Sequence, residues 1–210
     1  MNQKKIFLKS EGDKWFLRNR NNIDLKISLS KDPILNYLKK KKVCFRSVLE
    51  IGCSNGYRLE LIKHIKENLQ LYGIDPSKKA ILEGRKKFNK LNLKVGTADK
   101  LEFPKEKFDL VIFGFCLYLC DRKDLIKILY EANRVLKKKG LVIIYDFYSS
   151  SPFSNEYLHY NGVKSYKMDY SKIFLWNPQY ELIEKKIFKY DKNKKNSNDN
   201  NLSLFVIKKK

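Results

Sequence analysis

The sequence predicts an α/β fold of three layers, in which a doubly wound and mostly parallel sheet of seven strands is covered by helices on both faces. Short apolar stretches rich in β-branched residues alternate with amphipathic helical patterns, which is typical of strand–helix–strand units. Most of these stretches are continuously apolar, as expected of strands buried on both faces. The 210 residues, 43% of them hydrophobic, are enough to bury the core of one such domain.

The predicted strands follow directly from the apolar stretches, each flanked by turn residues. Two closing strands follow the first five and are separated by the polar low-complexity segment DKNKKNSNDNN at 191–201, which we expect to form a hairpin loop. The seven predicted strands are 47–51, 70–74, 92–95, 108–115, 140–147, 180–190 and 202–208.

Helices are predicted where apolar residues recur at helical spacing between these strands. A short helix is expected to begin at Asp32-Pro33, because an aspartate before a proline is a typical helix start. A last helix is expected over 163–175. The remaining helical faces are Leu61, Ile62, Ile65 and Leu69; Ala80, Ile81, Gly84, Phe88 and Leu91; and Leu125, Leu129, Ala132 and Leu136.

Charge and cysteine content narrow the class of protein. The formal net charge is +22, but only seven of the 45 basic residues are arginine, the side chain best suited to phosphate and base recognition. We therefore expect no nucleic-acid partner. The four cysteines form no C-x-x-C pair, and no run of eighteen apolar residues occurs, which indicates reduced thiols, no membrane span and a cytoplasmic protein.

The stretch VLEIGCSNG at 48–56 resembles a strand entering a glycine-bearing turn. Gly52 and Gly56 would let the backbone turn sharply near a ligand. Ser54 stands where a phosphate-cradling loop would have another glycine, and Glu50 precedes the turn. A carboxylate repels a diphosphate but attracts an amino group or a sulfonium, so the loop indicates a ligand without phosphates.

Two aspartates at later strand ends complete this prediction. Asp75 ends the second strand, 23 residues after Gly52, where an acidic side chain can accept hydrogen bonds from ribose hydroxyls. Asp99 follows the third strand and is placed to accept a hydrogen bond from an adenine amine. A ligand with adenine, ribose, positive sulfur and an amino-acid tail is S-adenosylmethionine.

Residues 45–148 resemble the class I S-adenosylmethionine-dependent methyltransferases, through the motif Glu50-Ile51-Gly52-Cys53-Ser54-Asn55-Gly56 and the acids that follow it. The resemblance implies the strand order 3-2-1-4-5-7-6 with an antiparallel last strand. It also implies a single domain over 1–210, with an N-terminal lid and helix at 1–43, a cofactor-binding core at 44–148, and an acceptor-side segment with a closing β-hairpin at 149–210. The cofactor-binding residues it implies are Glu50, Gly52, Cys53, Ser54, Gly56, Asp75, Pro76, Asp99 and Phe115.

Two flanking stretches resemble methylases associated with pseudaminic acid and other surface-sugar biosynthesis. These are GDKWFLRN at 12–19 and the looser match DFYSSSPF…YSKIF at 146–174. By this likeness the acceptor would be a hydroxyl of a small sugar or nucleotide-sugar in polysaccharide biosynthesis. Trp15 and Arg18 would belong to a lid, with Arg18 meeting the cofactor carboxylate or an acidic acceptor; the alternative is a packing arm.

Methyl transfer to a hydroxyl requires alignment and removal of a proton. His159 titrates near neutral pH and is the candidate general base; a substrate contact and a plain loop residue are its alternatives. Asp146 is expected to hold the acceptor hydroxyl or to orient His159, or else to cap a turn at Ser149-Ser150. Phe115 would line the acceptor pocket or fill the core. An RNA methyltransferase and a non-catalytic S-adenosylmethionine-binding scaffold remain the alternative functions.

Overall fold

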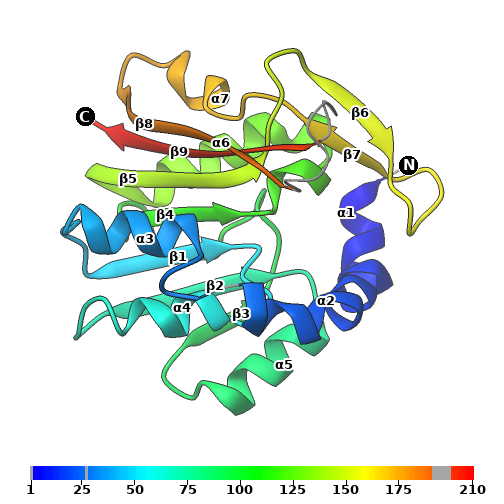
Figure 1. Ribbon diagram of the computed structural model, residues 1–210, viewed down its shortest axis with the longest axis horizontal. Helices are drawn as coiled ribbons and strands as arrows, with labels where there is room; N and C mark the ends of the chain where they lie inside the picture. The colour runs from blue at the N-terminus through cyan, green and yellow to red at the C-terminus, as the bar shows by residue number, and fades with distance from the viewer. Residues whose placement is uncertain (1, 27, 191–199) are drawn as a thin grey trace.

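The computed structural model describes residues 2–26, 28–190 and 200–210. One seven-stranded sheet forms its centre, in the order β3-β2-β1-β4-β5-β9-β8 (Figure 1). Strands β1 to β5 pair parallel with their neighbours, while β9 pairs antiparallel with both β5 and β8, so β9 alone runs opposite to the other six strands of this sheet. This order and the antiparallel last strand confirm the predicted fold. The strands are β1 Ser47–Ile51, β2 Gln70–Asp75, β3 Asn92–Val95, β4 Phe108–Gly114, β5 Leu136–Phe147, β8 Tyr180–Lys189 and β9 Asn201–Lys209.

Helices cover the two faces of the sheet and close two hydrophobic cores. On one face lie α3 Pro33–Lys40, α4 Tyr57–Ile62 and α5 Lys78–Lys87, and on the other lie α6 Leu125–Val135 and α7 Lys172–Leu175. All five residues of β1 are buried, because this strand is central and covered on both sides. The start of α3 is as predicted, since its N-cap is Asp32.

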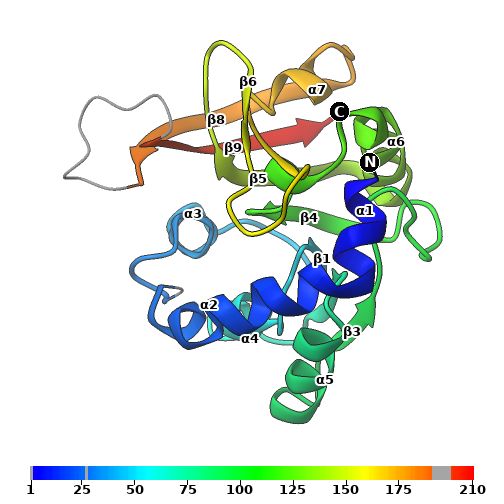
Figure 2. The same cartoon turned by 90° about the vertical axis from the view of Figure 1, so that its right-hand side faces the viewer.

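The N-terminal residues form a nearly continuous helical arm, made of α1 Gln3–Ile6, the π-helix η1 Phe7–Glu11 and α2 Gly12–Lys26. This N-terminal arm (residues 2–26) crosses the edge of the sheet where the parallel strands end (Figures 1 and 2). A small hairpin of β6 Phe153–Glu156 and β7 Lys164–Lys167 lies at the same edge. Segments from both ends of the chain therefore meet at one side of the sheet.

The structure corrects two sequence predictions. The helix expected over 163–175 is wrong for its first part, because Lys164–Lys167 pairs with β6 as a strand. Gln3 fixes that strand by accepting the N–H of Lys164 at 2.8 Å and donating to its carbonyl at 3.1 Å. Strand β5 begins at Leu136 rather than at Gly140, since an irregularity in its register with β4 accommodates the extra residues.

Most of the loop predicted at 191–201 lies outside the described residues. The prediction of no membrane span agrees with the described helices, since none of them is long and apolar enough to cross a bilayer.

Candidate active site

An open cavity lies at the carboxyl ends of β1, β2 and β4. The strand ends contribute Gly52, Asp75 and Gly114 to its wall, and the N-terminal arm contributes Lys4 and Trp15. Open parallel sheets bind their ligands at this edge, where the strand order reverses. The topology therefore places the predicted glycine turn and the predicted acids at a ligand site.

The turn after β1 keeps its shape through three residues with left-handed backbone conformations. The φ angle is +76° at Gly52, +53° at Ser54 and +80° at Gly56. Gly52 lines the cavity, and a Cβ at that position would lie only 2.8 Å from the Cβ of Cys116. Ser54 takes a conformation that glycine adopts at less cost, so the turn forms with two glycines where dinucleotide sites usually have three.

Asp75 connects this turn to the end of β2. Its Oδ2 accepts the N–H of Ser54 and its Oδ1 accepts the N–H of Ser77, both at 2.8 Å. Burial raises the pKa of Asp75 to about 6, although the two N–H groups lower it. A carboxylate oxygen can accept more than one hydrogen bond, so Asp75 can bind ribose hydroxyls while it holds the turn. The neighbouring Pro76 also lines the cavity.

The cavity is acidic although the chain carries a net charge of +22. Asp75, Asp99, Asp121 and Asp124 all line it. Among the described lining residues, Lys4 is the only lysine or arginine, and its Nζ lies 2.5 Å from Oδ2 of Asp99. Four carboxylates against one ammonium favour a ligand with positive charge.

Glu50 lies behind the cavity wall and is fully buried. Its Oε1 accepts a hydrogen bond from the guanidinium of Arg58, which also donates to Asp32 at 3.0 Å. Its Oε2 is buried and makes no hydrogen bond within the described part of the chain. Burial raises the pKa of Glu50 to about 7, while Arg58 lowers it. A carboxylate with one free oxygen thus lies beside the predicted ligand turn.

An aromatic wall follows the end of β4. Phe115 lines the cavity with φ at +54°, an uncommon conformation for a bulky residue. Its ring packs edge-to-face on Tyr145 and Phe147, with centroid separations of 4.8 and 5.7 Å. Backbone strain of this kind is concentrated at functional sites. Phe115 therefore packs against its aromatic neighbours and lines the cavity at the same time.

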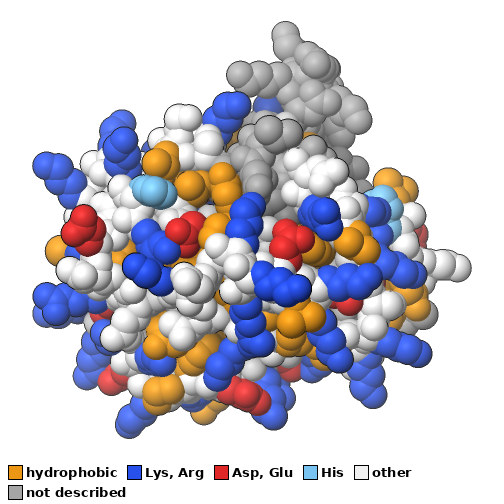
Figure 3. All heavy atoms as spheres, turned by 90° about the horizontal axis from the view of Figure 1, so that it is seen from below, with side chains coloured by type: hydrophobic (Ala, Val, Ile, Leu, Met, Phe, Trp, Pro, Cys, Tyr) orange, Lys and Arg blue, Asp and Glu red, His pale blue; other side chains and the backbone are white. Residues whose placement is uncertain are grey.

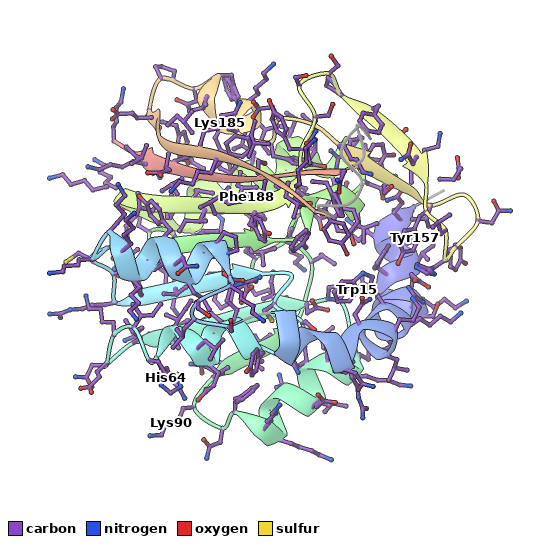
Figure 4. All side chains as sticks on the ribbon, in the orientation of Figure 1. Trp15, His64, Lys90, Tyr157, Lys185 and Phe188 are labelled. Atoms are coloured by element: carbon purple, nitrogen blue, oxygen red, sulfur yellow. The ribbon has the colours of Figure 1, made fainter. Side chains whose placement is uncertain are left out.

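Arg18 does not line the cavity but joins the N-terminal arm to the β6–β7 hairpin. It donates to Oε1 of Glu11 at 2.5 Å and to the hydroxyl of Tyr157 at 2.9 Å. Glu11, Arg18 and Tyr157 make up what we call the arm–hairpin latch. The exposed ring of His159 packs on Tyr157 at 5.2 Å, and no hydrogen bond joins it to Asp146 in the described structure. Trp15 and Tyr157 lie on the same side of the molecule (Figure 4).

Asp146 holds the turn that follows β4. Its Oδ2 accepts the N–H groups of Cys116, Leu117 and Tyr118 at 3.1, 2.8 and 3.3 Å, and its Oδ1 accepts that of Phe147 at 2.8 Å. The capped turn is therefore the one at 116–118 rather than the one at Ser149-Ser150. This geometry favours a structural role, because Asp146 is fully buried, does not line the cavity, and accepts three backbone N–H groups on Oδ2 alone.

Several residues at the site escaped the sequence prediction. Lys4, Asp121 and Arg58 reach it from segments without a recognisable motif. Cys53, which was predicted to bind cofactor, has its thiol turned into the core, where a Cβ on Gly73 would lie 2.6 Å from its Sγ. Any contact of Cys53 with a ligand would therefore have to come from its backbone.

Comparison with known proteins gives a family match over the part of the chain that carries most of this site. Residues 48–140 match a family model described as a methyltransferase domain. The matched residues include the turn, Asp75, Asp99 and Phe115. This part of the chain is therefore similar to methyltransferase domains.

The curated relatives of this chain carry names that refer to different acceptors. Over 99 residues the chain is 33% identical to a demethylmenaquinone methyltransferase of Thermotoga maritima, covering 46% of this chain and 42% of that protein. Over 108 residues it is 35% identical to a tRNA U34 carboxymethyltransferase of Sulfurimonas denitrificans, covering 49% and 35%. The chain therefore matches less than half the length of these relatives.

A solved structure extends the fold likeness beyond the residues matched by the family model. The 1,6-didemethyltoxoflavin-N1-methyltransferase of Burkholderia thailandensis, solved with 1,6-didemethyltoxoflavin and S-adenosylhomocysteine, has a TM-score of 0.70. The alignment covers 98% of this chain and 88% of that one at 13% identity. At this identity the similarity establishes the fold alone.

Proposed function

We propose that this protein transfers a methyl group from S-adenosylmethionine to a small acceptor. One observation carries the proposal: an acidic cavity in a strongly basic chain lies at the carboxyl ends of β1, β2 and β4, in the part of the chain similar to methyltransferase domains. Such a cavity suits a cationic adenosine compound better than a dinucleotide with its negatively charged diphosphate.

The residues present fit this cofactor. Asp75 would accept hydrogen bonds from the ribose hydroxyls, and Asp99 would accept one from the adenine amine while it stays paired with Lys4. Glu50, through its unpartnered oxygen, would face positive charge. Bound S-adenosylmethionine supplies a methyl group already activated by its sulfonium. The protein has to orient the acceptor, exclude water and accept a proton.

The N-terminal arm and the β6–β7 hairpin would complete the acceptor side. Both stretches that resemble surface-sugar methylases, 12–19 and 146–174, lie there, and they contact each other through Arg18 and Tyr157. This arrangement supports a hydroxyl of a sugar or nucleotide-sugar as the first acceptor class to test. His159, at the exposed end of the hairpin loop, would take the proton. The cofactor-binding core at 44–148 would thus be flanked by an N-terminal lid and helix at 1–43 and by an acceptor-side segment at 149–210.

Titration calorimetry tests the cofactor. S-adenosylmethionine and S-adenosylhomocysteine are expected to bind, and NAD is not. Asp75→Asn should weaken S-adenosylhomocysteine binding by roughly tenfold or more, because hydrogen bonds to a charged group are worth about 1.5–3 kcal/mol. Tight binding of NAD, or an unchanged affinity in the variant, would contradict the proposal. Binding without turnover on a sugar panel would favour the non-catalytic scaffold.

An RNA acceptor is the second candidate, supported by the net charge of +22 and by the similarity to a tRNA-modifying enzyme. Figure 3 shows lysine and arginine side chains spread over one face, with acidic and apolar side chains among them. Phosphate-driven binding weakens steeply with salt. Methyl transfer to RNA that is lost between low and high salt would favour this candidate, whereas salt-resistant transfer to a small acceptor would exclude it.

A further inference from the structure

Arg58 lies between two carboxylates in the interior of the protein. Its Nε donates to Oδ2 of Asp32 at 3.0 Å, and its Nη1 donates to Oε1 of Glu50. Arg58, Asp32 and Glu50 are all buried, with exposed fractions of 5%, 3% and 0%. Asp32 uses its other oxygen to cap α3, accepting the N–H of Ile34 at 2.9 Å. The cluster therefore holds three charges in the interior and carries one excess negative charge.

The two carboxylates of the cluster differ in how well their negative charge is compensated. Asp32 has partners for both oxygens, whereas Oε2 of Glu50 has no hydrogen-bond partner among the described residues. Leaving a buried charged oxygen unpaired is costly. The carboxylate lies just behind Gly114, where an added Cβ would be 3.3 Å from Oε1 of Glu50. Gly114 lines the cavity, so the carboxylate of Glu50 lies directly behind the cavity wall.

We infer that Arg58 is a positioning residue: it holds one oxygen of Glu50 and thereby keeps the other available for the ammonium group of a ligand in the cavity. The inference rests on the proposed function, because S-adenosylmethionine and S-adenosylhomocysteine both carry such an ammonium on their amino-acid tail. The ammonium would meet Oε2 directly or through one ordered water.

Arg58 also favours the ionised form of Glu50. Burial raises the pKa of Glu50 to about 7, Arg58 on α4 lowers it, and Asp32 before α3 and Asp75 on β2 raise it. Cys53, which follows β1, is the other titratable group beside Glu50, but burial together with the charges of Asp75 and Glu50 raises the pKa of its thiol well above the usual value, so it stays uncharged. Removing the guanidinium leaves three acids acting on one another, so the pKa of Glu50 rises further. Glu50 would then be neutral at about pH 7 and could not pair with an ammonium.

Two ligands separate this role from a merely structural one. S-adenosylhomocysteine has the amino-acid tail, whereas 5′-methylthioadenosine has the same adenosine without the tail ammonium. The test measures the dissociation constants of both for the full chain and for Arg58→Met and Arg58→Lys, between about pH 6 and about pH 8.5. Arg134→Met is the matched control, because it removes an arginine paired with Glu131 on α6.

In Arg58→Met, S-adenosylhomocysteine is expected to bind roughly tenfold to a hundredfold more weakly at about pH 7 and to recover toward higher pH. Binding of 5′-methylthioadenosine should stay within about twofold. Arg58→Lys should lie between Arg58→Met and the unchanged protein. Equal losses for both ligands, or no loss for either, would overturn the inference.

Arg58→Met leaves buried acids without their cation and can fail to fold. Glu50→Gln then supplies the test, because it removes the titrating group. Its S-adenosylhomocysteine affinity should be low and should not change with pH, and 5′-methylthioadenosine should still bind. A pH-dependent affinity like that of the unchanged protein would overturn the inference. If the unchanged protein binds neither ligand, the proposed function itself is wrong.

Discussion

The ammonium of Lys4 lies 2.5 Å from Oδ2 of Asp99 and 3.6 Å from Oδ2 of Asp124. This contact ties the first helix of the chain to the wall of the cavity. Lys4 is partly exposed, whereas Asp99 is almost fully buried. The N-terminal arm therefore has an electrostatic anchor at one end and the arm–hairpin latch further along.

Lys4→Met should loosen the N-terminal arm. Loss of a partly exposed ion pair is worth about 1 kcal/mol, so the open population should rise about fivefold. Limited proteolysis with chymotrypsin measures this as faster cleavage after Trp15 or Phe16. Lys5→Met is the control, because Lys5 is exposed. Equal cleavage rates in the two variants would show that the pair does not hold the arm.

Gly52→Ala should destabilise the protein and abolish cofactor binding. The substitution combines a φ of +76° with a Cβ only 2.8 Å from that of Cys116. We expect a loss of about 2 kcal/mol or more in the free energy of unfolding, measured in urea. Gly96 also lines the cavity, but its added Cβ would meet Ile74 at an ordinary 3.7 Å. Gly96→Ala should therefore keep near-normal stability, and similar losses in both variants would refute the argument.

Asp146→Asn should gain stability relative to the unchanged protein as pH rises. Burial raises the pKa of Asp146 to about 7, although four backbone N–H groups lower it. The carboxyl group of Asp146 therefore stabilises the folded protein below about pH 4, and this stabilisation is lost as pH rises through about 7. Each unit by which folding raises the pKa is worth about 1.4 kcal/mol. Urea unfolding at about pH 5 and about pH 8 measures the difference.

Asp109→Asn is the control, because its stability relative to the unchanged protein should change with pH in the opposite direction. Burial raises the pKa of Asp109, but Lys137 and the N–H groups of Arg46 and Ser47 lower it to about 2. Its contribution is present above about pH 4 and lost as pH falls toward about 2. The variant should therefore lose stability relative to the unchanged protein as pH rises from about 2 to about 4. The same trend with pH in both variants would contradict these assignments.

His159→Asn should reduce methyl transfer and leave cofactor affinity unchanged. A general base contributes about 10²–10⁴-fold to the rate, so a loss in this range is expected. His64 is also exposed but lies away from Trp15 and Tyr157 (Figure 4), so His64→Asn serves as the control. Full activity of His159→Asn on an accepted substrate would assign the proton to another group.

The sequence predicted the central sheet closely, because its strands are continuously apolar. The bounds predicted for β1 and β3 agree with the structure, and Asp75 and Asp99 were located by their places after strands. Parallel strands end at one edge, so acids at strand ends come together whatever the loops between them do.

The surroundings of the cavity were harder to predict, because they depend on contacts between distant segments. Arg58 and Asp32 are 26 residues apart, and Gln3 and Lys164 are 161 apart. No periodicity relates such pairs. Lys164–Lys167 is a strand only because β6 and Gln3 supply its partners, so local spacing alone favoured a helix there.

The arm–hairpin latch draws its members from opposite ends of the chain, since Glu11 and Arg18 precede the sheet and Tyr157 follows five of its strands. None of these three residues lines the cavity, whereas the strand ends do. The contacts that fasten the N-terminal arm therefore come from segments outside the first five strands, and substitutions in these segments can change how the arm is held without altering the strand order.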